Sequence, residues 1–327
     1  MAKASIIIPA YNVENYIHRA IESALSQTEP DIEVIVIDDG STDRTSEIAA
    51  ACAKGDPRFR LCRQENTGVS GARNHGLQLA MADCVLFLDA DDWLERNAVE
   101  QMLLLQEEEP GKLICVEPYF VSFQNSGDIR REQQGVGEQK EIRNREQALL
   151  SVGRSNKFHF TSSCYKLFSR RIIEGQNLGF REDIHYGEDG LFVFQYLNCV
   201  DGVSYTPIPL WNILERPGSA TTAPYTSKWL TVFTSVQTML STEGLSDAVQ
   251  ANLKASMASW ALTLAIIGLR SGTITDEELE LVRGKLSEHW DAWKKKGVSF
   301  KHYLQVMVIL KCPRKVGEWM IQMRRKT

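Results

Sequence analysis

The sequence has no long apolar run. The longest stretch without a charged residue lies between Lys254 and Arg270 and is shorter than the roughly 20 residues that a membrane-spanning helix needs. No basic segment with a long apolar core precedes the first apolar run, Ser5–Pro9, so a secretory signal is not expected. These two absences predict a cytoplasmic protein.

Glycine, proline and cysteine are not abundant either. The 22 glycines and 10 prolines among 327 residues exclude collagen-like and disordered chains. The seven cysteines are odd in number and include no Cys-x-x-Cys spacing, which favours reduced thiols over disulfides or a zinc site. The net charge of −5 argues against a general nucleic-acid binder.

Charge is unevenly distributed along the chain. Residues 294–327 hold ten Lys and Arg against one acid, Glu318, whereas the remainder holds 27 Lys and Arg against 41 acids. An acidic body with a basic tail predicts an anionic partner for the tail. Hydrophobic residues make up 43% of the chain, which at this length is enough for one large domain or two ordinary ones.

Apolar runs and helix-periodic segments alternate in the N-terminal half. The expected strands are Ser5–Pro9, Ile32–Ile37, Phe59–Cys62 and Cys84–Leu88. One helix is expected to begin after Asn15, and two more are expected at Thr45–Ala53 and Val69–Ala82. Alternation of this kind predicts βαβ units and an α/β fold with a mainly parallel sheet covered on both faces.

The pattern weakens after residue 116. From Glu117 to about Arg154 we expect an irregular segment with one short helix near Glu146–Leu150, because glycine, glutamine and charge dominate. A strand at Phe158–Phe168 and a helix at Leu191–Leu197 follow. Beyond Pro217 the long apolar-periodic segments predict an all-helical C-terminal region from about residue 225.

Polar clusters follow three of the expected strands. They begin at Pro9, at Asp38 and at Asp89, and the carboxyl ends of parallel strands are where open α/β sheets bind ligands. Carboxylates gathered at one edge repel one another, and a divalent cation relieves this repulsion. Oxygen-only ligands suit Mg²⁺ or Mn²⁺, so Asp89 and Asp91 are the candidate metal ligands. A metal there also explains how an acidic edge could bind a diphosphate.

Each cluster has a simpler interpretation when taken alone. Asp38-Asp39-Gly40-Ser41 could be a turn with a helix cap, and acid-x-acid patterns such as Asp89-Ala90-Asp91 are common by chance. The loop from Asn66 has Gly68 and Gly71, which allow close backbone approach, and Arg73, which could pair with a phosphate or a base. The alternative there is a tight loop with a surface arginine.

The joint pattern resembles a known family. The motifs Ser5-Ile-Ile-Ile-Pro-Ala-Tyr-Asn12, Asp38-Asp-Gly-Ser-Thr-Asp43, Asn66-x-Gly-x-x-x-Ala-Arg-Asn-x-Gly76 and Leu88-Asp-Ala-Asp-Asp-Trp93 occur in order and at familiar spacing. The chain resembles bacterial family 2 glycosyltransferases. The resemblance is strong over about residues 4–115, continues to about residue 222 and is much weaker beyond it. The resemblance implies a GT-A, Rossmann-like domain at 1–222, with nucleotide-sugar binding in 1–115 and the acceptor side in 116–222. A helical domain would follow at 223–327.

The resemblance also implies a mechanism and its residues. It implies inverting transfer from a nucleotide-diphospho-sugar with Mn²⁺ or Mg²⁺, and a UDP-sugar is expected because UDP is commonest in the family. Asp189 would be the catalytic base, with Glu188 orienting the acceptor; taken alone, Asp189 could be a helix-cap carboxylate. Trp93 is expected to line the sugar site. The implied donor-binding residues are Pro9, Tyr11, Asn12, Glu14, Asp38, Asp39, Ser41, Asn66, Gly71, Arg73, Asp89, Ala90, Asp91 and Arg216.

The expected acceptor is a glycan or a lipid-linked oligosaccharide of a surface polysaccharide. In the basic tail, apolar residues recur at helical spacing from Phe300 to Val308 and again from Val316 to Met323. Such a segment can lie on an anionic membrane, placing the protein at the inner face of the plasma membrane, or it can dock on the protein itself.

Other activities of α/β proteins require motifs that this sequence lacks. The segment after the first strand, Pro9–Asn12, lacks the glycine-rich loop of a sugar nucleotidyltransferase and the GxGxxG of a nicotinamide dehydrogenase. The alternative from a different class is a non-catalytic nucleotide-sugar-binding or scaffold protein of a polysaccharide assembly complex. Such a protein should have lost one of the acids, and all are present.

Overall fold

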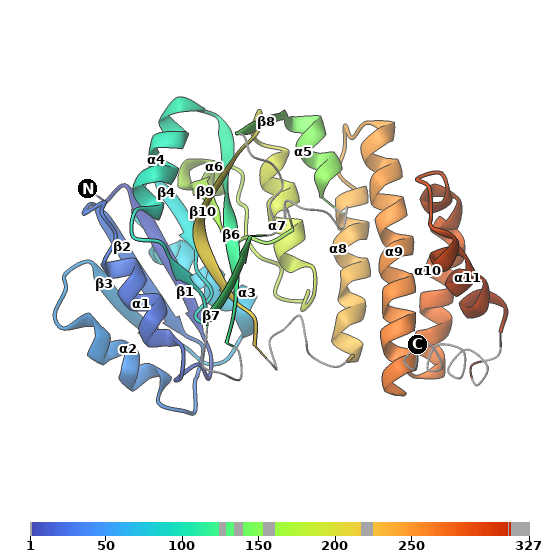
Figure 1. Ribbon diagram of the computed structural model, residues 1–327, viewed down its shortest axis with the longest axis horizontal. Helices are drawn as coiled ribbons and strands as arrows, with labels where there is room; N and C mark the ends of the chain where they lie inside the picture. Colours follow the sequence, from blue (N-terminus) through green and yellow to red (C-terminus); the bar gives the residue numbers. More distant parts are fainter. Residues whose placement is uncertain are drawn as a thin grey trace. The chain divides into compact units, whose positions relative to one another are not determined.

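The computed structural model describes residues 2–123, 129–133, 140–152, 161–216, 225–312 and 314 (Figure 1). The chain divides into two compact units. The first comprises Met1–Ser151, Ser155–Glu182 and Phe192–Arg216, and the second comprises Val152–Arg154, Asp183–Leu191 and Pro217–Thr327. The second unit therefore takes in residues 183–191, which the sequence pattern groups with residues 1–222.

The first unit begins with the alternating pattern that the sequence predicts. Its elements are β1 (Ala4–Ala10), α1 (Ile17–Leu25), β2 (Ile32–Asp38), α2 (Thr45–Ala53), β3 (Phe59–Arg63), α3 (Gly68–Leu79) and β4 (Cys84–Phe87). These four strands are parallel and lie in the order β3-β2-β1-β4. Every residue of β1 and β2 is buried, as a sheet covered on both faces requires.

The sheet continues with strands from later in the chain. The next elements are β5 (Trp93–Leu94), α4 (Ala98–Glu108), β6 (Lys112–Phe123), β7 (Ile129–Gln133), β8 (Glu141–Asn144), α5 (Arg145–Ser151), β9 (Lys166–Ser169), α6 (Arg170–Gly175) and β10 (Gly202–Leu214). The order β3-β2-β1-β4-β9-β6-β10-β5 makes one sheet, in which β9 is antiparallel to both of its neighbours and β10 is parallel to β6.

The expectation of an irregular segment after Glu117 is wrong for the described residues. The twelve-residue strand β6 runs through Glu117 and Pro118 and pairs with β10, whose register shifts at Pro209. Tertiary pairing decides strand formation here, and prolines lie where a bulge tolerates them. The expected helix near residue 146 is confirmed as α5, and part of the expected strand at 158–168 lies outside the described residues.

Helix α3 approaches β1 closely, and a glycine permits this. A Cβ atom on Gly76 would lie 2.3 Å from Cγ2 of Ile7, which is fully buried in β1. The absence of a side chain at Gly76 therefore brings α3 against the sheet. Its first turn consequently lies beside the carboxyl end of β2, where Asp39 follows the strand.

The second unit is helical, as the sequence predicts for the region from Tyr225. It contains the start of α7 (Glu188–Leu197), a 3₁₀ turn (Ser227–Leu230), α8 (Thr231–Leu240), α9 (Asp247–Ser271), α10 (Asp276–Lys294) and α11 (Phe300–Lys311). Helix α9 packs against α8, α10 and α11. Ser246, Thr275 and Ser299 cap the last three helices with their side chains.

By length and composition alone, helix α9 could cross a membrane. This differs from the sequence-based expectation, in which the uncharged stretch between Lys254 and Arg270 is too short to do so. Its most apolar window has a mean hydropathy of 1.2, and 67% of that window is buried inside the protein. The packing of three other helices around α9 accounts for this burial. Within the described chain it is the central helix of the second unit.

Candidate functional site

The loops after β1 and β2 are bound to one another. Asn12 has a left-handed backbone with φ of 52°, and its N–H donates to the Ser41 hydroxyl at 3.1 Å. The Asn12 side-chain oxygen accepts from the Thr42 N–H at 2.8 Å. Earlier in the first of these loops, Pro9 is buried at the end of β1, whereas the Tyr11 side chain is 49% exposed. Asn12 and Ser41 thus fix the edge of the site and leave the Tyr11 ring open to stack on a ligand.

Glu14 joins the same two loops from the other side. Its carboxylate accepts the Arg44 N–H at 3.0 Å, and its own N–H donates to Asp43 at 3.1 Å. Asp43 also accepts from the N–H of Thr45 at 2.9 Å, the first residue of α2. Glu14 is thus held as part of the loop scaffold around the expected donor site.

Asp38 and Asp39 are buried at the end of β2 and take different partners. Asp38 accepts the Ser41 N–H at 2.9 Å and lies 3.6 Å from Nε of Arg63. This is the turn that the simpler interpretation describes. Asp39 instead reaches α3: one oxygen accepts from Thr67 N–H at 2.9 Å, and the other accepts from Gly68 N–H at 2.8 Å. That second oxygen retains a lone pair for a further donor.

The start of α3 contributes glycine and arginine. A Cβ on Gly71 would lie 2.1 Å from the Thr67 hydroxyl oxygen, so packing inside the loop requires this glycine. Asn66 is exposed in the loop before the helix. Arg73 is only 3% exposed and donates to Asp89 at 3.0 Å, so the alternative of a surface arginine is wrong.

The acids after β4 lie among arginines. Asp89 pairs with Arg73, and Asp91 accepts from Nε of Arg216 at 2.8 Å. Arg19 donates to the main-chain oxygen of Asp91 at 3.1 Å. Ala90, between the two acids, is buried. The structure thereby brings together the predicted residues Arg73, Asp89, Asp91 and Arg216 at one edge of the sheet.

Burial and mutual repulsion act on these acids. Burial and the charge of Asp89 raise the pKa of Asp91, and Arg216 opposes this rise. Burial, followed by the charges of Asp89 and Asp91, raises the pKa of Asp92 well above its usual range. Asp92 accepts the Leu214 N–H at 3.0 Å, which ties the acidic turn to β10. The turn therefore concentrates negative charge that a cation would relieve.

We tested whether these residues suit a divalent metal. No group of three or more His, Cys, Asp and Glu able to hold a metal ion occurs among the described residues. Asp89 and Asp91 supply two partly exposed carboxylates, and their oxygens suit Mg²⁺ or Mn²⁺. The pair fits a metal whose other ligands come from a diphosphate and water.

Three residues at this edge, Arg19, Tyr16 and Gln64, are not among those predicted from the sequence. The Arg19 guanidinium lies 3.5 Å from the centre of the Trp93 ring, which is therefore covered on one face. Arg216 similarly lies 4.6 Å from the Tyr16 ring centre. Gln64 donates to Asp39 at 2.8 Å. No local pattern marks Arg19, because its partners Asp91 and Trp93 lie over 70 residues away along the chain.

Glu188 and Asp189 are the first residues of α7 and belong to the second unit, whereas the residues described above belong to the first. Both are half-buried. The preceding loop is attached to α8: the N–H groups of His185 and Tyr186 donate to the Thr231 hydroxyl oxygen at 3.1 and 3.0 Å. A helix start favours carboxylates, so the simpler interpretation of Asp189 also fits its position.

The loop before Asp189 is further restrained by Gly187 and Tyr186. Gly187 has φ of +90°, and its carbonyl accepts from the Ser235 hydroxyl at 2.7 Å. The Tyr186 ring stacks on Trp229 with centroids 4.6 Å apart and meets Trp260 edge-on at 5.4 Å. These contacts fix the start of α7 within the second unit.

Comparison with known proteins gives one consistent result. The family model described as Glycosyl transferase family 2 matches residues 5–175. EpsH of Bacillus subtilis (strain 168), named as a glycosyltransferase, is 34% identical over 215 residues, which are 64% of this chain. These residues span only 59% of EpsH, so the chain matches well under two thirds of that relative.

Solved structures have the same fold. Staphylococcus aureus TarS 1-349 in complex with UDP-GlcNAc gives a TM-score of 0.70 at 19% identity, covering 98% of this chain and 92% of that chain. The mannosyltransferase PcManGT from Pyrobaculum calidifontis, in complex with GDP-Man and Mn²⁺, gives 0.56 at 15% identity, covering 98% and 84%. At these identities the likeness concerns the fold.

Proposed function

The chain belongs to glycosyl transferase family 2 and has the GT-A fold with a helical C-terminal region, and we propose that it transfers a sugar from a nucleotide-diphospho-sugar to a hydroxyl group of a glycan or lipid-linked oligosaccharide. The observation that carries the proposal is the edge of the sheet where Arg73, Asp89, Asp91 and Arg216 come together. Asp39 binds the first turn of α3, the helix that also holds Arg73.

The nucleoside is assigned to the ends of β1 and β2. The exposed ring of Tyr11 is available to stack on a base, and the second oxygen of Asp39 retains a lone pair that could accept a uracil N–H. A UDP-sugar is the donor that this pair suits. The likeness to TarS, which was solved with UDP-GlcNAc, supports the same choice.

The diphosphate is assigned to the acids and arginines after β4. Asp89 and Asp91 would hold Mn²⁺ or Mg²⁺, and PcManGT was solved with Mn²⁺. The bound cation would supply Lewis-acid stabilisation of the leaving diphosphate. Arg73 and Arg216 pair with these acids, and with the cation on the two carboxylates both guanidinium groups would be available to phosphate oxygens.

Asp189 is the proposed base of an inverting displacement. The acceptor oxygen bonds to the anomeric carbon from the face opposite the diphosphate, the bond to that phosphate oxygen breaks, and the proton passes to Asp189. Glu188 is proposed to orient the acceptor. The restrained loop before α7 supports a positioning requirement for these two carboxylates.

A cytoplasmic location is proposed with this activity. All seven cysteines are present as thiols, which suits a reducing compartment. Nucleotide-sugar donors and free thiols would then share that compartment.

A donor screen tests the proposed function. The full chain with Mn²⁺ is incubated with UDP-, GDP- and dTDP-sugars and glycolipid extract, and nucleotide release is measured. We expect release from one donor, a loss of about 10²–10⁴-fold in Asp189→Asn from removal of the base, and no release in Asp91→Ala or after chelation.

Carboxylates outside the site serve as matched controls. Asp31→Asn in the first unit and Asp291→Asn in the second change exposed acids and should keep full activity. Donor binding without release under every condition would reject the transferase and favour the non-catalytic nucleotide-sugar-binding or scaffold protein.

A further inference from the structure

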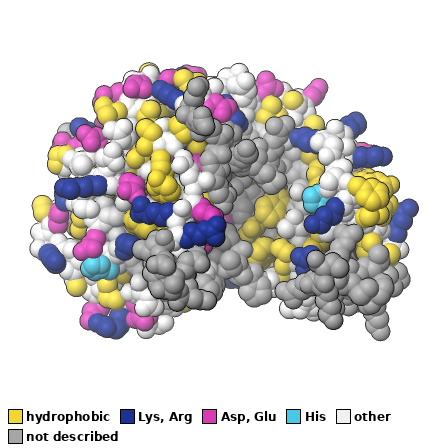
Figure 2. Space-filling model, viewed as in Figure 1, with side chains coloured by type: hydrophobic (Ala, Val, Ile, Leu, Met, Phe, Trp, Pro, Cys, Tyr) yellow, Lys and Arg dark blue, Asp and Glu magenta, His cyan; other side chains and the backbone are white. Residues whose placement is uncertain are grey.

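An exposed apolar surface lies at the start of α11. Phe300 is 76% exposed, Tyr303 is 39% exposed and Leu304 is 37% exposed. Figure 2 shows hydrophobic side chains gathered beside dark blue Lys and Arg side chains and a His, in the region where Figure 1 draws α11. Three large apolar side chains within five residues are unusual on a face open to water.

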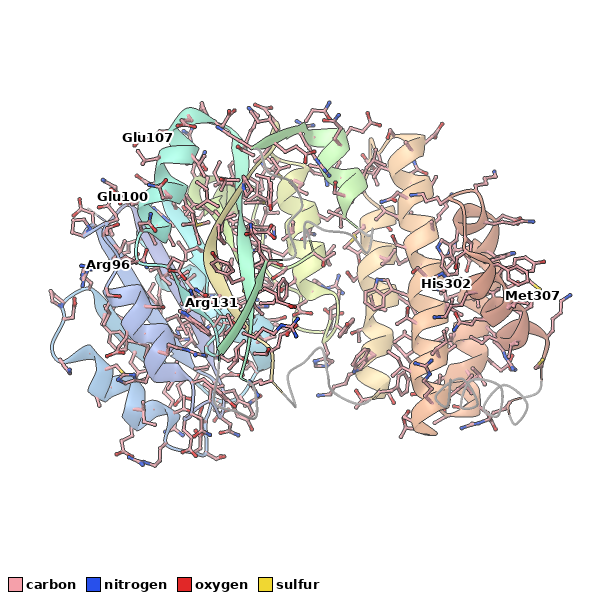
Figure 3. The ribbon with its side chains drawn as sticks, in the orientation of Figure 1. Arg96, Glu100, Glu107, Arg131, His302 and Met307 are labelled. Carbon is pink, nitrogen blue, oxygen red and sulfur yellow. The ribbon has the colours of Figure 1, made fainter. Side chains whose placement is uncertain are left out.

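Helix α10 extends this surface with two tryptophans. The Trp290 ring lies 5.8 Å from both the Trp293 ring and the Tyr303 ring, and Trp293 lies 5.8 Å from the His302 ring. Figure 3 labels His302 on α11. We call Trp290, Trp293, Phe300, Tyr303 and Leu304 the aromatic face.

The other side of α11 is occupied. Val306 and Ile309 are buried, and α11 packs on α9 and α10. Val306 and Ile309 are not among the residues of the expected stripe, whose first three members, Phe300, Tyr303 and Leu304, face solvent. The second stripe, from Val316 to Met323, lies outside the described residues.

The charges that follow the aromatic residues of α10 have one sign, although exposed Glu288 and Asp291 lie beside Trp290 on α10 itself. Residues 294–311 include five lysines and no acid, in a chain whose net charge is −5. These lysines, at positions 294, 295, 296, 301 and 311, are all exposed. A surface of this composition attracts anions at long range and offers apolar rings at contact.

We propose that the aromatic face and its lysines dock on an anionic lipid membrane. Trp and Tyr favour the boundary between headgroups and acyl chains, and Phe and Leu insert beyond it. The lysines pair with lipid phosphates. A nucleic acid would pair with the lysines but would leave the exposed side chains of Phe300 and Leu304 in water. The inference is independent of the proposed function, because none of its residues is among those assigned to donor binding or catalysis.

Vesicle flotation tests the proposal on the full chain. Protein is mixed with vesicles of phosphatidylcholine alone or of phosphatidylcholine with phosphatidylglycerol, and the floated fraction is measured. We expect flotation with the anionic vesicles only. The double variant Phe300→Ser/Leu304→Ser and the triple variant Lys294→Gln/Lys295→Gln/Lys301→Gln should each bind at least tenfold more weakly.

Two controls separate this surface from others. Met81→Ser changes an apolar side chain that is 70% exposed in the first unit, and it should bind as the wild type does. The variant Arg324→Gln/Arg325→Gln/Lys326→Gln removes charge from the end of the chain and should stay within twofold. Circular dichroism checks that each variant is folded.

Several results would overturn the proposal. They are absence of wild-type flotation, unchanged flotation of Phe300→Ser/Leu304→Ser, or loss of flotation confined to the variant at 324–326. Concentration-dependent dimerisation without vesicle binding, abolished by Phe300→Ser/Leu304→Ser, would assign the face to a second copy of the chain. Binding of RNA but not of vesicles would assign it to nucleic acid.

Discussion

Glu33 is a buried carboxylate of β2 that connects three parts of the first unit. It accepts from the Ser5 hydroxyl at 2.6 Å and from the Met81 and Ala82 N–H groups at 2.6 and 3.0 Å, and it pairs with Arg60. Burial alone would raise the pKa of Glu33, but the hydrogen bonds and Arg60 lower it below its usual value. The ionised carboxylate therefore stabilises the fold.

Glu33→Gln should lower the free energy of unfolding by about 1–3 kcal/mol at pH 7. The folded pKa is depressed, so the stabilisation is present above the unfolded value of 4.5 and is lost as the pH falls through the lower folded value. In urea titrations, the difference in the free energy of unfolding between wild type and Glu33→Gln should become smaller below pH 4.5. Glu47→Gln, an exposed partner of Arg44, is the control and should change little. A difference that does not change with pH would contradict a stabilising role of the ionised Glu33 carboxylate.

At the residue scale, the sequence predicts acids better than their partners. Asp38, Asp39, Asp89 and Asp91 follow strands in an alternating pattern, so their shared edge could be predicted. Arg19 could not be predicted, because nothing within its own helix distinguishes it from a solvated arginine. Its role comes from Trp93, which only the folded chain brings to it.

At the scale of elements, α8 holds the loop that precedes α7. Gly187 has φ of +90°, where a side chain is strained, and a Cβ there would also lie 3.2 Å from Ser235. The Ser235 hydroxyl donates to the Gly187 carbonyl, two residues before Asp189. Position and direction of the first turn of α7 thus depend on a helix that follows it in the chain.

Ser235→Ala should lower kcat about tenfold and leave the KM for the donor unchanged, because the base loses its position while the donor site is intact. Thr231→Ser keeps the hydroxyl that accepts from His185 and Tyr186 and should retain activity. Thr231→Val removes this hydroxyl and should lower kcat. The matched control is Ser241→Ala, whose hydroxyl donates to Gln237 within α8. Equal kcat values for Ser235→Ala and Ser241→Ala would reject the role of Ser235 in positioning Asp189. Full activity of Asp189→Asn would instead reject Asp189 as the base.

The elements of the first 90 residues and the later helices are predicted well, whereas the long strands after residue 116 are not. Buried parallel strands are apolar along their length, so β1 and β2 stand out in the sequence. Strands β6 and β10 carry Glu117, Pro207 and Pro209, and they exist because they pair with each other across a bulge. That pairing joins residues about 90 positions apart, which no local pattern records.

At the scale of the whole molecule, the nucleotide site should contribute to thermal stability. UDP with Mn²⁺ at 100 times its Kd should stabilise the protein by about 2.7 kcal/mol, which corresponds to a rise in melting temperature of about 5–10 °C. Tyr11→Ala should lose most of this rise at the same concentration, and EDTA should reduce it. Met81→Ser should behave as the wild type. No rise with any nucleoside diphosphate would contradict the assignment of the nucleotide site.

The division into two units is also a property of the whole chain. The sequence places the change to helices near residue 223, and the described helices follow it. Contacts nevertheless assign residues 183–191 to the second unit. The hydroxyl groups of Thr231 and Ser235 make these contacts about 45 residues away, so composition along the chain does not indicate them.

Strand β9 completes the sheet between β4 and β6, and this has a consequence for biosynthesis. Strand β4 ends at Phe87 and β9 begins at Lys166, so the ribosome must add about 80 residues before the second edge of β4 is paired. A nascent chain of 115 residues already contains Asp39, Asp89 and Asp91 but exposes an unpaired strand edge, which promotes aggregation. We therefore expect truncations that end before Ser169 to be insoluble even though they keep these acids.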